Sequence, residues 1–342
     1  MKRNIHISVI ICTYKRKEAL EANLARFRGS RFFNEADELY GKLSIRIIDN
    51  ASELMEVKER YIKLYHNPNT GGSGGFTRGI IETRKDEKEY GITHVVFMDD
   101  DVECQMESFY RLYALLVLCK EEYQNSMIAG RMFRMDAKNI QYTAAEVWNA
   151  GDIRHIGCNL DMTRQENLSS ANDNTGAEYG GWWFACFPMN FVREQTPLPF
   201  FLHCDDVEYG LRHGGAPIIL NGIQVWHETY EYRQSPAIAY YDTRNPLIVN
   251  AMYGLLPEKE VVLAEWKRKI SECHVRGDYL TEYMIILGMW DFLKGKKWFE
   301  RENVQKKHNS LLKKQIFIRY RNAIFWRVTE NIHKKLEISE TY

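Results

Sequence analysis

The sequence predicts an α/β fold with a helical C-terminal region. Apolar runs at 7–12, 43–48, 61–65 and 94–98 indicate buried strands, and helical patterns separate most of them. Because alternating strands and helices form parallel sheets with right-handed crossovers, we expect these four strands to lie in one sheet. From about residue 236 the pattern is helical and continues to the end of the chain.

Composition limits the class of protein. The 342 residues suffice for one large domain and an appendage, and a hydrophobic fraction of 45% is typical of a globular protein. No apolar run reaches the ~18 residues of a membrane span, and the first residues lead into a strand rather than a signal peptide. Seven cysteines without a C-x-x-C pair argue against a zinc site or a disulfide framework, so we expect a reduced cytosolic setting.

Charge is unevenly distributed along the chain. Segment 294–335 carries 13 Lys and Arg against 3 Asp and Glu, a net charge of +10 that the remainder balances. Apolar and aromatic residues alternate with these cations, which is typical of a helix lying in the headgroups of an anionic membrane. We therefore expect peripheral membrane association and no nucleic-acid binding, since no recognised nucleic-acid-binding fold is present. A solvated helical bundle is the alternative.

Asp49 ends the second predicted strand. The carboxyl edge of an open α/β sheet is where ligands bind, and a carboxylate there can accept hydrogen bonds from a base or a ribose. The following Asn-Ala-Ser makes turn capping the alternative role.

Glycines cluster at 71–75, after the third strand, and open a helix that we expect to reach about residue 88. Glycine lets a backbone approach a ligand closely, and a helix N-terminus attracts phosphate. The spacing matches neither a P-loop nor a dinucleotide fingerprint, so a flexible turn is the alternative.

Asp99, Asp100 and Asp101 follow the fourth strand. Alternate residues of a strand point to opposite sides, so Asp99 and Asp101 can share one side. Two hard oxygen ligands at this edge suit Mg²⁺ or Mn²⁺ carrying a diphosphate. An acidic run that only solvates a loop is the alternative.

The middle region, 126–226, is irregular, and we expect 159–179 to be a mobile loop over the sheet. Trp182 and Trp183 follow two glycines there. Neighbours in an extended chain face opposite ways, so we expect them to bind a sugar rather than serve a core. One core and one interface tryptophan is the alternative.

Asp205 and Asp206 follow an apolar stretch and open a helix. Helix capping needs one carboxylate, so the other is available as a general base toward an incoming hydroxyl. His227 follows a further short strand. An isolated histidine is usually structural, but beside an Asp-x-Asp pair its imidazole can be a third ligand to Mn²⁺.

In this order, the segments resemble family 2 glycosyltransferases with the GT-A fold, and within that family bacterial galactofuranosyltransferases. The matching segments are 12–16, 69–76, 97–101, 181–183, 205–212, 226–227 and 244–245. The resemblance implies a GT-A type, Rossmann-like mixed sheet that binds a nucleotide sugar. It also implies a catalytic domain at 1–250 and a helical, basic region at 251–342.

The resemblance implies a role for each candidate residue. The UDP-sugar donor would be held by Arg16, Asp49, Asn69, Gly74 and Asp100. Mn²⁺ or Mg²⁺ would be ligated by Asp99, Asp101 and His227. Asp206 would be the catalytic base, and the acceptor would be bound by Trp182, Trp183, Glu146 and Asp205.

The resemblance implies an inverting transfer of galactofuranose from UDP-galactofuranose to a lipid-linked glycan of a bacterial O-antigen or capsule, at the inner face of the cell membrane. Another donor is one alternative: dTDP-rhamnose, UDP-galactopyranose or UDP-glucose. A non-catalytic sugar-nucleotide-binding protein is another. Because the first strand starts by residue 7, we expect the N-terminal β domain of the polymerising members to be absent. Chain extension is therefore not implied, and a homo-oligomer stays open.

Overall fold

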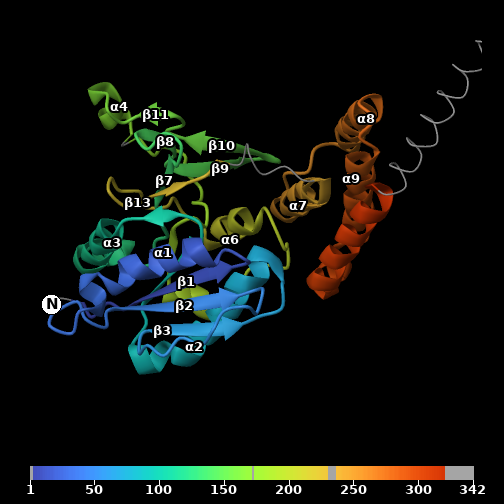
Figure 1. The fold of residues 1–342 in the computed structure, drawn as a ribbon. Coiled ribbons are helices and arrows are strands. Elements are labelled where there is room, and N and C mark those ends of the chain that lie inside the picture. The colour runs from blue at the N-terminus through green and yellow to red at the C-terminus, as the bar shows by residue number, and fades with distance from the viewer. Residues whose placement is uncertain (1–2, 172, 230–235, 320–342) are drawn as a thin grey trace, which may run out of the picture. The chain divides into compact units, whose positions relative to one another are not determined.

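The computed structural model describes residues 3–171, 173–229 and 236–319. The chain divides into two compact units, Met1–Arg233 and Gln234–Tyr342. The first unit contains a six-stranded sheet, a five-stranded sheet and a two-stranded hairpin, and the described part of the second is helical (Figure 1). The predicted α/β fold with a C-terminal helical region is confirmed.

The six-stranded sheet has the order β3-β2-β1-β4-β12-β6. Its first four strands are parallel, as the sequence predicts, and β12 runs antiparallel to β4 and β6. The strands are β1 (Ile7–Thr13), β2 (Leu43–Asp49), β3 (Ile62–His66), β4 (His94–Asp99), β6 (Ile128–Ala129) and β12 (Ala185–Pro188). The sheet is therefore mixed, and the carboxyl ends of β1, β2 and β4 share one edge.

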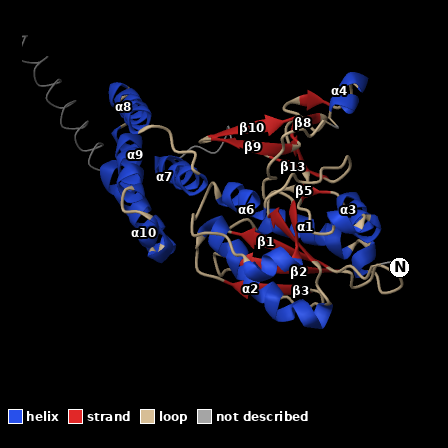
Figure 2. Cartoon of the chain, turned by 180° about the vertical axis from the view of Figure 1, so that it is seen from behind, coloured by secondary structure: helices blue, strands red, loops and turns tan. Residues whose placement is uncertain are grey.

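Helices cover both faces of this sheet (Figures 1 and 2). Val9 and Ile11 of β1 belong to a core shared with α1 and α3, whereas Ile10 belongs to a core shared with α2, α5 and α6. Because successive residues of β1 enter different cores, most of the strand is apolar, and its buried Ser8 hydroxyl is paired with Thr83. The helices of this unit are α1 (Lys17–Arg28), α2 (Gly71–Tyr90), α3 (Met106–Leu118), α4 (Gln165–Ser170), α5 (Met189–Glu194) and α6 (Asp205–His213), with 3₁₀ turns at Arg31–Phe33 and Glu121–Tyr123.

The five-stranded sheet has the order β11-β8-β7-β13-β5. Its strands are β5 (Glu103–Cys104), β7 (Arg131–Arg134), β8 (Ile140–Thr143), β11 (Leu160–Asp161) and β13 (Gln224–His227), and the hairpin consists of β9 (Ala145–Asn149) and β10 (Asp152–Ile156). Strand β11 and helix α4 lie where the sequence predicts an irregular loop. Asp161 organises this segment by accepting hydrogen bonds from Thr163 and Asn139.

The second unit contains helices α7 (Pro236–Tyr253), α8 (Lys259–Val275), α9 (Tyr279–Phe292) and α10 (Lys296–Arg301), and a further helix at 304–319. Helix α7 packs on α9, where a Cβ at Gly288 would lie 2.7 Å from the carbonyl oxygen of Tyr240. Residue 250 lies inside helix α7. The division expected there, between a catalytic domain at 1–250 and a helical region at 251–342, stays a prediction. Among the helices described, none combines the length and apolar character needed to cross a membrane.

Candidate active site

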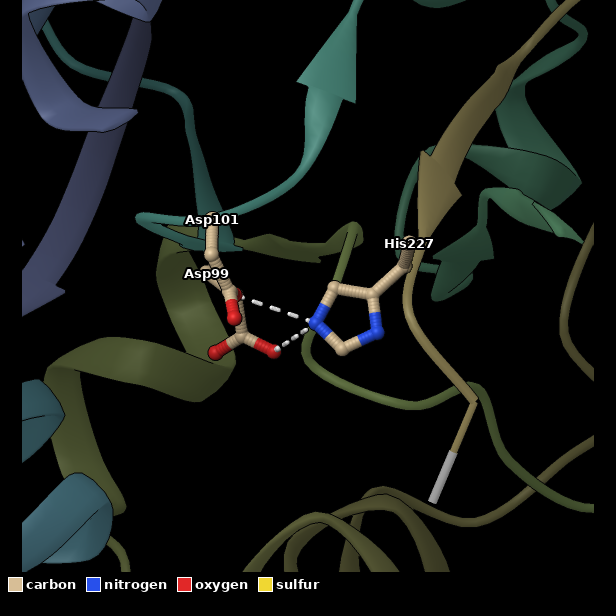
Figure 3. Close-up of side chains that lie close together, drawn as sticks. All are labelled: Asp99, Asp101 and His227. Atoms are coloured by element: carbon tan, nitrogen blue, oxygen red, sulfur yellow. Dashed lines mark hydrogen bonds and ion pairs between the residues drawn. The ribbon is translucent and has the colours of Figure 1, made fainter. Parts of the chain in front are cut away.

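Asp99, Asp101 and His227 form a carboxylate–imidazole cluster at the carboxyl edge of the six-stranded sheet (Figure 3). His227 Nε2 lies 3.1 Å from Asp101 Oδ1 and 3.7 Å from Asp99 Oδ2. One ligand atom from each residue lies within 4.8 Å of the others. The imidazole is buried and both carboxylates are partly exposed, so the cluster is accessible from the carboxylate side.

Strand pairing explains why residues far apart in the sequence meet in this cluster. Asp99 is the last residue of β4, and the chain then continues into β5. Strand β5 pairs antiparallel with β13 in a register that puts Trp226 opposite Glu103. The next residue of β13, His227, therefore lies beside the residues that precede β5, which include Asp101.

The donor set of the cluster suits a divalent cation. Two carboxylate oxygens and one imidazole nitrogen are ligands that Mn²⁺ accepts, and carboxylates are the protein ligands that Mg²⁺ prefers. The three residues predicted to ligate a metal are therefore brought together, with atoms close enough to share one ion. That they hold an ion, Mn²⁺ or Mg²⁺, stays a prediction.

Arg16 and Asp100 border the cluster. Arg16 Nη1 donates to Asp101 Oδ2 at 2.5 Å and to Asp100 Oδ1 at 3.2 Å. The buried Asp100 also accepts a hydrogen bond from Thr13 Oγ1 at 2.7 Å, and burial raises its pKa to about 6. Asp100 thus anchors Arg16 at the end of β1. The predicted contacts of Arg16 and Asp100 with the nucleotide stay predictions.

Asp49 caps the turn that follows β2. Its buried carboxylate accepts four backbone N–H groups at 2.8–3.0 Å, from Ala51, Ser52, Glu53 and Leu54. Four hydrogen bonds fill the usual acceptor sites of a carboxylate. The structure therefore supports the turn-capping alternative, and a hydrogen bond from Asp49 to the nucleotide stays a prediction.

The glycine cluster, Gly71 to Gly75, forms the first turn of α2 and not a flexible turn. A Cβ at Gly71 would lie 2.0 Å from the carbonyl oxygen of Phe201, and one at Gly74 would lie 2.3 Å from Thr70 Oγ1. Asn69 Oδ1 accepts a hydrogen bond from Gly71 N at 3.2 Å. Close packing therefore explains these glycines without a ligand, and donor binding by Asn69 and Gly74 stays a prediction.

The segment before α6 has a strained backbone. Phe201, His203 and Cys204 have φ angles of +75°, +61° and +66°, in a region that residues with a side chain rarely adopt. Phe201 N donates to Ser73 Oγ at 2.8 Å, which ties this segment to the glycine cluster. Such strain persists only where the surroundings enforce it, and it is frequent at active sites. This segment leads directly into the two aspartates that begin α6.

Asp205 and Asp206 hold protons more tightly than ordinary aspartates. Asp205 lies over the glycine cluster, since a Cβ at Gly72 would be 3.4 Å from Asp205 Oδ2. Burial raises the pKa of Asp205 to about 6. Burial, followed by the charges of Asp205 and Glu146, raises the pKa of Asp206 well above its ordinary value. Perturbed carboxylates of this kind are typical of acid–base sites.

Glu146, predicted to bind the acceptor, is brought close to the predicted base, Asp206. It is buried on β9, and its backbone N–H donates to the carbonyl oxygen of Tyr179 at 2.9 Å. Tyr179 is also buried, and burial, Glu146 and Asp206 together raise the pKa of its hydroxyl. Strand β9 therefore carries a carboxylate to the start of α6. Contact of Glu146 or Asp205 with an acceptor stays a prediction.

His155 is a site residue that the sequence reasoning missed. Its Nδ1 lies 2.8 Å from Glu146 Oε1, and the two residues are paired across the β9–β10 hairpin. A two-residue loop of Ala150 and Gly151, with φ angles of +50° and +120°, sets this register. The Asn-Ala-Gly-Asp sequence around that loop is the signal that could have predicted the hairpin.

Trp182 and Trp183 are core residues. Trp182 is 5% exposed and packs against Phe76 and Tyr209, with ring centroids 4.9 and 5.8 Å away. Trp183 is 1% exposed and donates Nε1–H to the carbonyl oxygen of Gly130 at 2.8 Å. The expectation that adjacent tryptophans do not serve a core is wrong, because both faces of the sheet are covered and each ring enters a different core. Neither ring is exposed for stacking on a sugar.

The rest of the segment that begins with Asp205 is structural. Glu208 is buried, and both of its oxygens accept hydrogen bonds from Arg212, at 2.9 and 2.8 Å. Tyr209 belongs to the aromatic core under the sheet, and Gly210 leaves room for Tyr179, whose Cβ would lie 2.4 Å from a Cβ there. These contacts hold α6 in place, so its two N-terminal aspartates are left for the site.

Comparison with known proteins agrees with the resemblance seen in the sequence. Residues 8–170 match the family described as Glycosyl transferase family 2. Galactofuranosyltransferase GlfT2 of Mycolicibacterium smegmatis is 26% identical over 252 residues, which cover 68% of this chain and 38% of that protein. The GlfT2 of Mycobacterium tuberculosis is 28% identical over 221 residues, covering 59% and 33%. The chain thus spans well under half the length of these relatives.

Solved structures show a weaker likeness. S. aureus TarS 1–349 superposes with a TM-score of 0.43 at 12% identity, covering 72% of this chain and 65% of that one. The mannosyltransferase PcManGT from Pyrobaculum calidifontis, in complex with GDP-Man and Mn²⁺, gives a TM-score of 0.42 at 12% identity and covers 92% and 89%. Neither likeness is close enough to transfer a residue's role.

Proposed function

We propose that the chain, whose residues 8–170 match glycosyl transferase family 2, is an inverting, metal-dependent galactofuranosyltransferase. It would move galactofuranose from UDP-galactofuranose to a hydroxyl of a glycan. The observation that carries the proposal is the carboxylate–imidazole cluster beside a second pair of carboxylates at the start of α6. The choice of donor rests on the two distant relatives named as galactofuranosyltransferases.

We propose Asp206 as the catalytic base. Its carboxylate would accept the proton of an acceptor hydroxyl, whose oxygen attacks the anomeric carbon while the bond to UDP breaks. A single displacement inverts the anomeric centre, so a UDP-α donor would give a β-linked product. The place of Asp206 in the first turn of α6, near Asp205 and Glu146, supports this role.

Asp99, Asp101 and His227 would hold Mn²⁺ or Mg²⁺ on the donor diphosphate, and the bound ion stabilises negative charge on a leaving UDP. Arg16 contacts two carboxylates at the same edge and would supply a second positive charge there. Asn69 and the glycine cluster would contact the nucleotide. For the buried Trp182 and Trp183, we propose only a supporting role beneath the acceptor.

We also propose a lipid-linked acceptor and peripheral binding to the inner face of the cell membrane. Trp290, Leu293, Ile316 and Phe317 are exposed near the start of, or within, the basic segment. Not every cation of that segment is available, because Lys294 pairs with the buried Asp291. Residues 320–335 of the segment lie outside the described residues. Flotation with anionic and neutral liposomes tests this part, and binding to neither would refute it.

Release of the nucleoside diphosphate, UDP or dTDP according to the donor, tests the catalytic proposal. The protein is incubated with Mn²⁺, a panel of octyl galactosides and, in separate reactions, UDP-galactofuranose, UDP-galactopyranose, UDP-glucose and dTDP-rhamnose. Selective turnover of UDP-galactofuranose is expected. Turnover of another donor would keep the mechanism but refute the sugar, and tight UDP binding without turnover of any donor would favour a non-catalytic protein.

A further inference from the structure

His155 and Glu146 form a cross-strand pair whose geometry goes beyond what a hairpin needs. They are directly opposite in the β9–β10 register, and the imidazole Nδ1 lies 2.8 Å from Glu146 Oε1. The carboxylate is 2% exposed, whereas the imidazole is 22% exposed. A buried carboxylate needs such a partner, because leaving it unpaired costs the full desolvation of the charge.

The other ring nitrogen of His155, Nε2, also has a partner. This nitrogen lies 3.3 Å from Tyr142 Oη, and the two rings pack with centroids 4.8 Å apart. The imidazole is therefore held by β8 on one side and by β9 on the other. A ring held at both nitrogens has one orientation, and it fixes the rotation of the carboxylate that it contacts.

The pair lies beside the proposed base. The Glu146 carboxylate is close enough to Asp206 for its charge to act there, and the Tyr179 hydroxyl lies near both groups. The backbone of Glu146 is bonded to Tyr179 on one side of β9, and its side chain is bonded to His155 on the other strand of the hairpin. Both backbone and side chain of Glu146 are thus restrained at this point.

We propose that His155 is a positioning residue for the acceptor. By holding Glu146 Oε1, it fixes the buried carboxylate beside Asp206 and the Tyr179 hydroxyl, and so fixes the place in which Asp206 receives the acceptor hydroxyl. Correct placement of a reacting hydroxyl is worth far more than one hydrogen bond, since small displacements of reacting groups cost large factors in rate. The inference rests on the proposed function, because it needs a sugar acceptor at Asp206.

The test uses full-length protein, UDP-galactofuranose, Mn²⁺ and the octyl galactoside that wild type turns over fastest. His155→Leu should raise the KM for this acceptor about tenfold while leaving the KM for the donor within about twofold. His155→Asn keeps a donor near the position of Nδ1 and should restore most of the acceptor affinity. If His155 only stabilised the fold, His155→Leu would change the KM for the donor and the KM for the acceptor alike. His155→Asn would then not restore the acceptor KM selectively.

A matched control comes from the second unit, where His274 Nδ1 lies 3.2 Å from Glu282 Oε2 in an exposed pair. His274→Leu should change neither KM. An unchanged acceptor KM in His155→Leu, or equal changes for both substrates, would overturn the inference while leaving the transferase intact. Wild type that releases no UDP from any donor would overturn the proposed function and this inference with it.

Discussion

Arg16 Nη1 lies 2.5 Å from Asp101 Oδ2, on the carboxylate whose other oxygen faces His227 at 3.1 Å. The Asp101 carboxylate therefore contacts both the Arg16 guanidinium, which is always positively charged, and the His227 imidazole. Neighbouring carboxylates repel one another, and Arg16 offsets part of this repulsion through Asp100 as well. In the proposed function, this edge would receive the donor diphosphate and the metal with Arg16 already in place.

The cluster should bind Mn²⁺ weakly when one of its members is changed. Asp101→Asn removes a charged ligand, and His227→Gln removes the imidazole, so each should lower Mn²⁺ affinity by at least about tenfold, or 1.4 kcal/mol. Titration calorimetry with Mn²⁺ in the presence of UDP measures this. Asp173→Asn changes an exposed carboxylate that is bonded to Thr175 and should have no effect. Equal affinities in all four proteins would refute the metal site.

Asp206→Asn should abolish most transfer without loss of nucleotide binding. An amide cannot accept the hydroxyl proton at neutral pH, and loss of a general base typically costs about 10²–10⁴-fold in rate. The measurements are kcat for UDP release and the Kd for UDP. A variant that retains wild-type kcat, or one that loses UDP binding, would contradict the role of Asp206.

The activity should increase with pH through the raised pKa of Asp206. The base works when ionised, and burial, Asp205 and Glu146 favour its protonated form, so the acidic limb of the kcat/KM profile should lie well above pH 4. Glu146→Gln removes one negative neighbour and should move that limb to lower pH. A profile that is flat from pH 5 to 8 in wild type would count against this assignment.

Asp205→Asn should stabilise the metal-free protein at neutral pH. The pKa of Asp205 is about 6 in the folded chain against 3.8 for an ordinary aspartate, so the folded state binds the proton more tightly. This contribution is present below the ordinary pKa of an aspartate and is lost as pH rises through about 6. Urea unfolding should therefore give Asp205→Asn a larger free energy of unfolding than wild type at pH 7.5, and the difference should vanish at pH 4.

Asp37 is a control for the measurement of unfolding free energy, because its pKa is shifted in the opposite direction from that of Asp205. A hydrogen bond from Arg31 lowers the pKa of this exposed carboxylate, so ionisation favours folding there. Asp37→Asn should not stabilise the protein at pH 7.5. Stabilisation by both substitutions would mean that the loss of general negative charge, rather than burial of Asp205, is responsible.

The parts of the fold that follow from local pattern were predictable from the sequence. The four parallel strands are mostly apolar because helices cover both faces, and Asp99 and Asp101 lie at the end of one of them. His227 could be offered only as a candidate. Its approach to Asp101 joins residues 126 positions apart and depends on the pairing of β5 with β13, and two-residue β5 has no periodicity to detect.

The missed features depend on what surrounds a residue in three dimensions. Trp182 and Trp183 look unsuited to a core until the β12 region is known to lie inside a sheet with two covered faces. The sequence is compatible with two roles for Asp49, nucleotide binding and turn capping. Four backbone N–H groups that donate to its carboxylate support turn capping. His155 matters only through its register with Glu146, which a hairpin prediction would have been needed to show.

Gly71 should be required for both stability and catalysis, and Gly91 separates the two possible causes. Both glycines have positive φ, +72° and +64°. A Cβ at Gly91 meets no atom within 4 Å, so Gly91→Ala carries only the conformational cost of roughly 1 kcal/mol. A Cβ at Gly71 would lie 2.0 Å from the Phe201 carbonyl oxygen, so Gly71→Ala adds overpacking and should cost about 3 kcal/mol.

The catalytic effect of Gly71→Ala follows from the same contact. Phe201 must move to admit the new methyl group, and it belongs to the strained segment that leads into Asp205 and Asp206. A displacement of about 1 Å at reacting groups can lower the rate 10²-fold, so kcat should fall strongly in Gly71→Ala and stay near wild type in Gly91→Ala. Urea unfolding and UDP release on both variants measure the two effects. If Gly71→Ala lost stability but kept its kcat, the segment before α6 would tolerate movement without disturbing the base, and its strain would have no catalytic role.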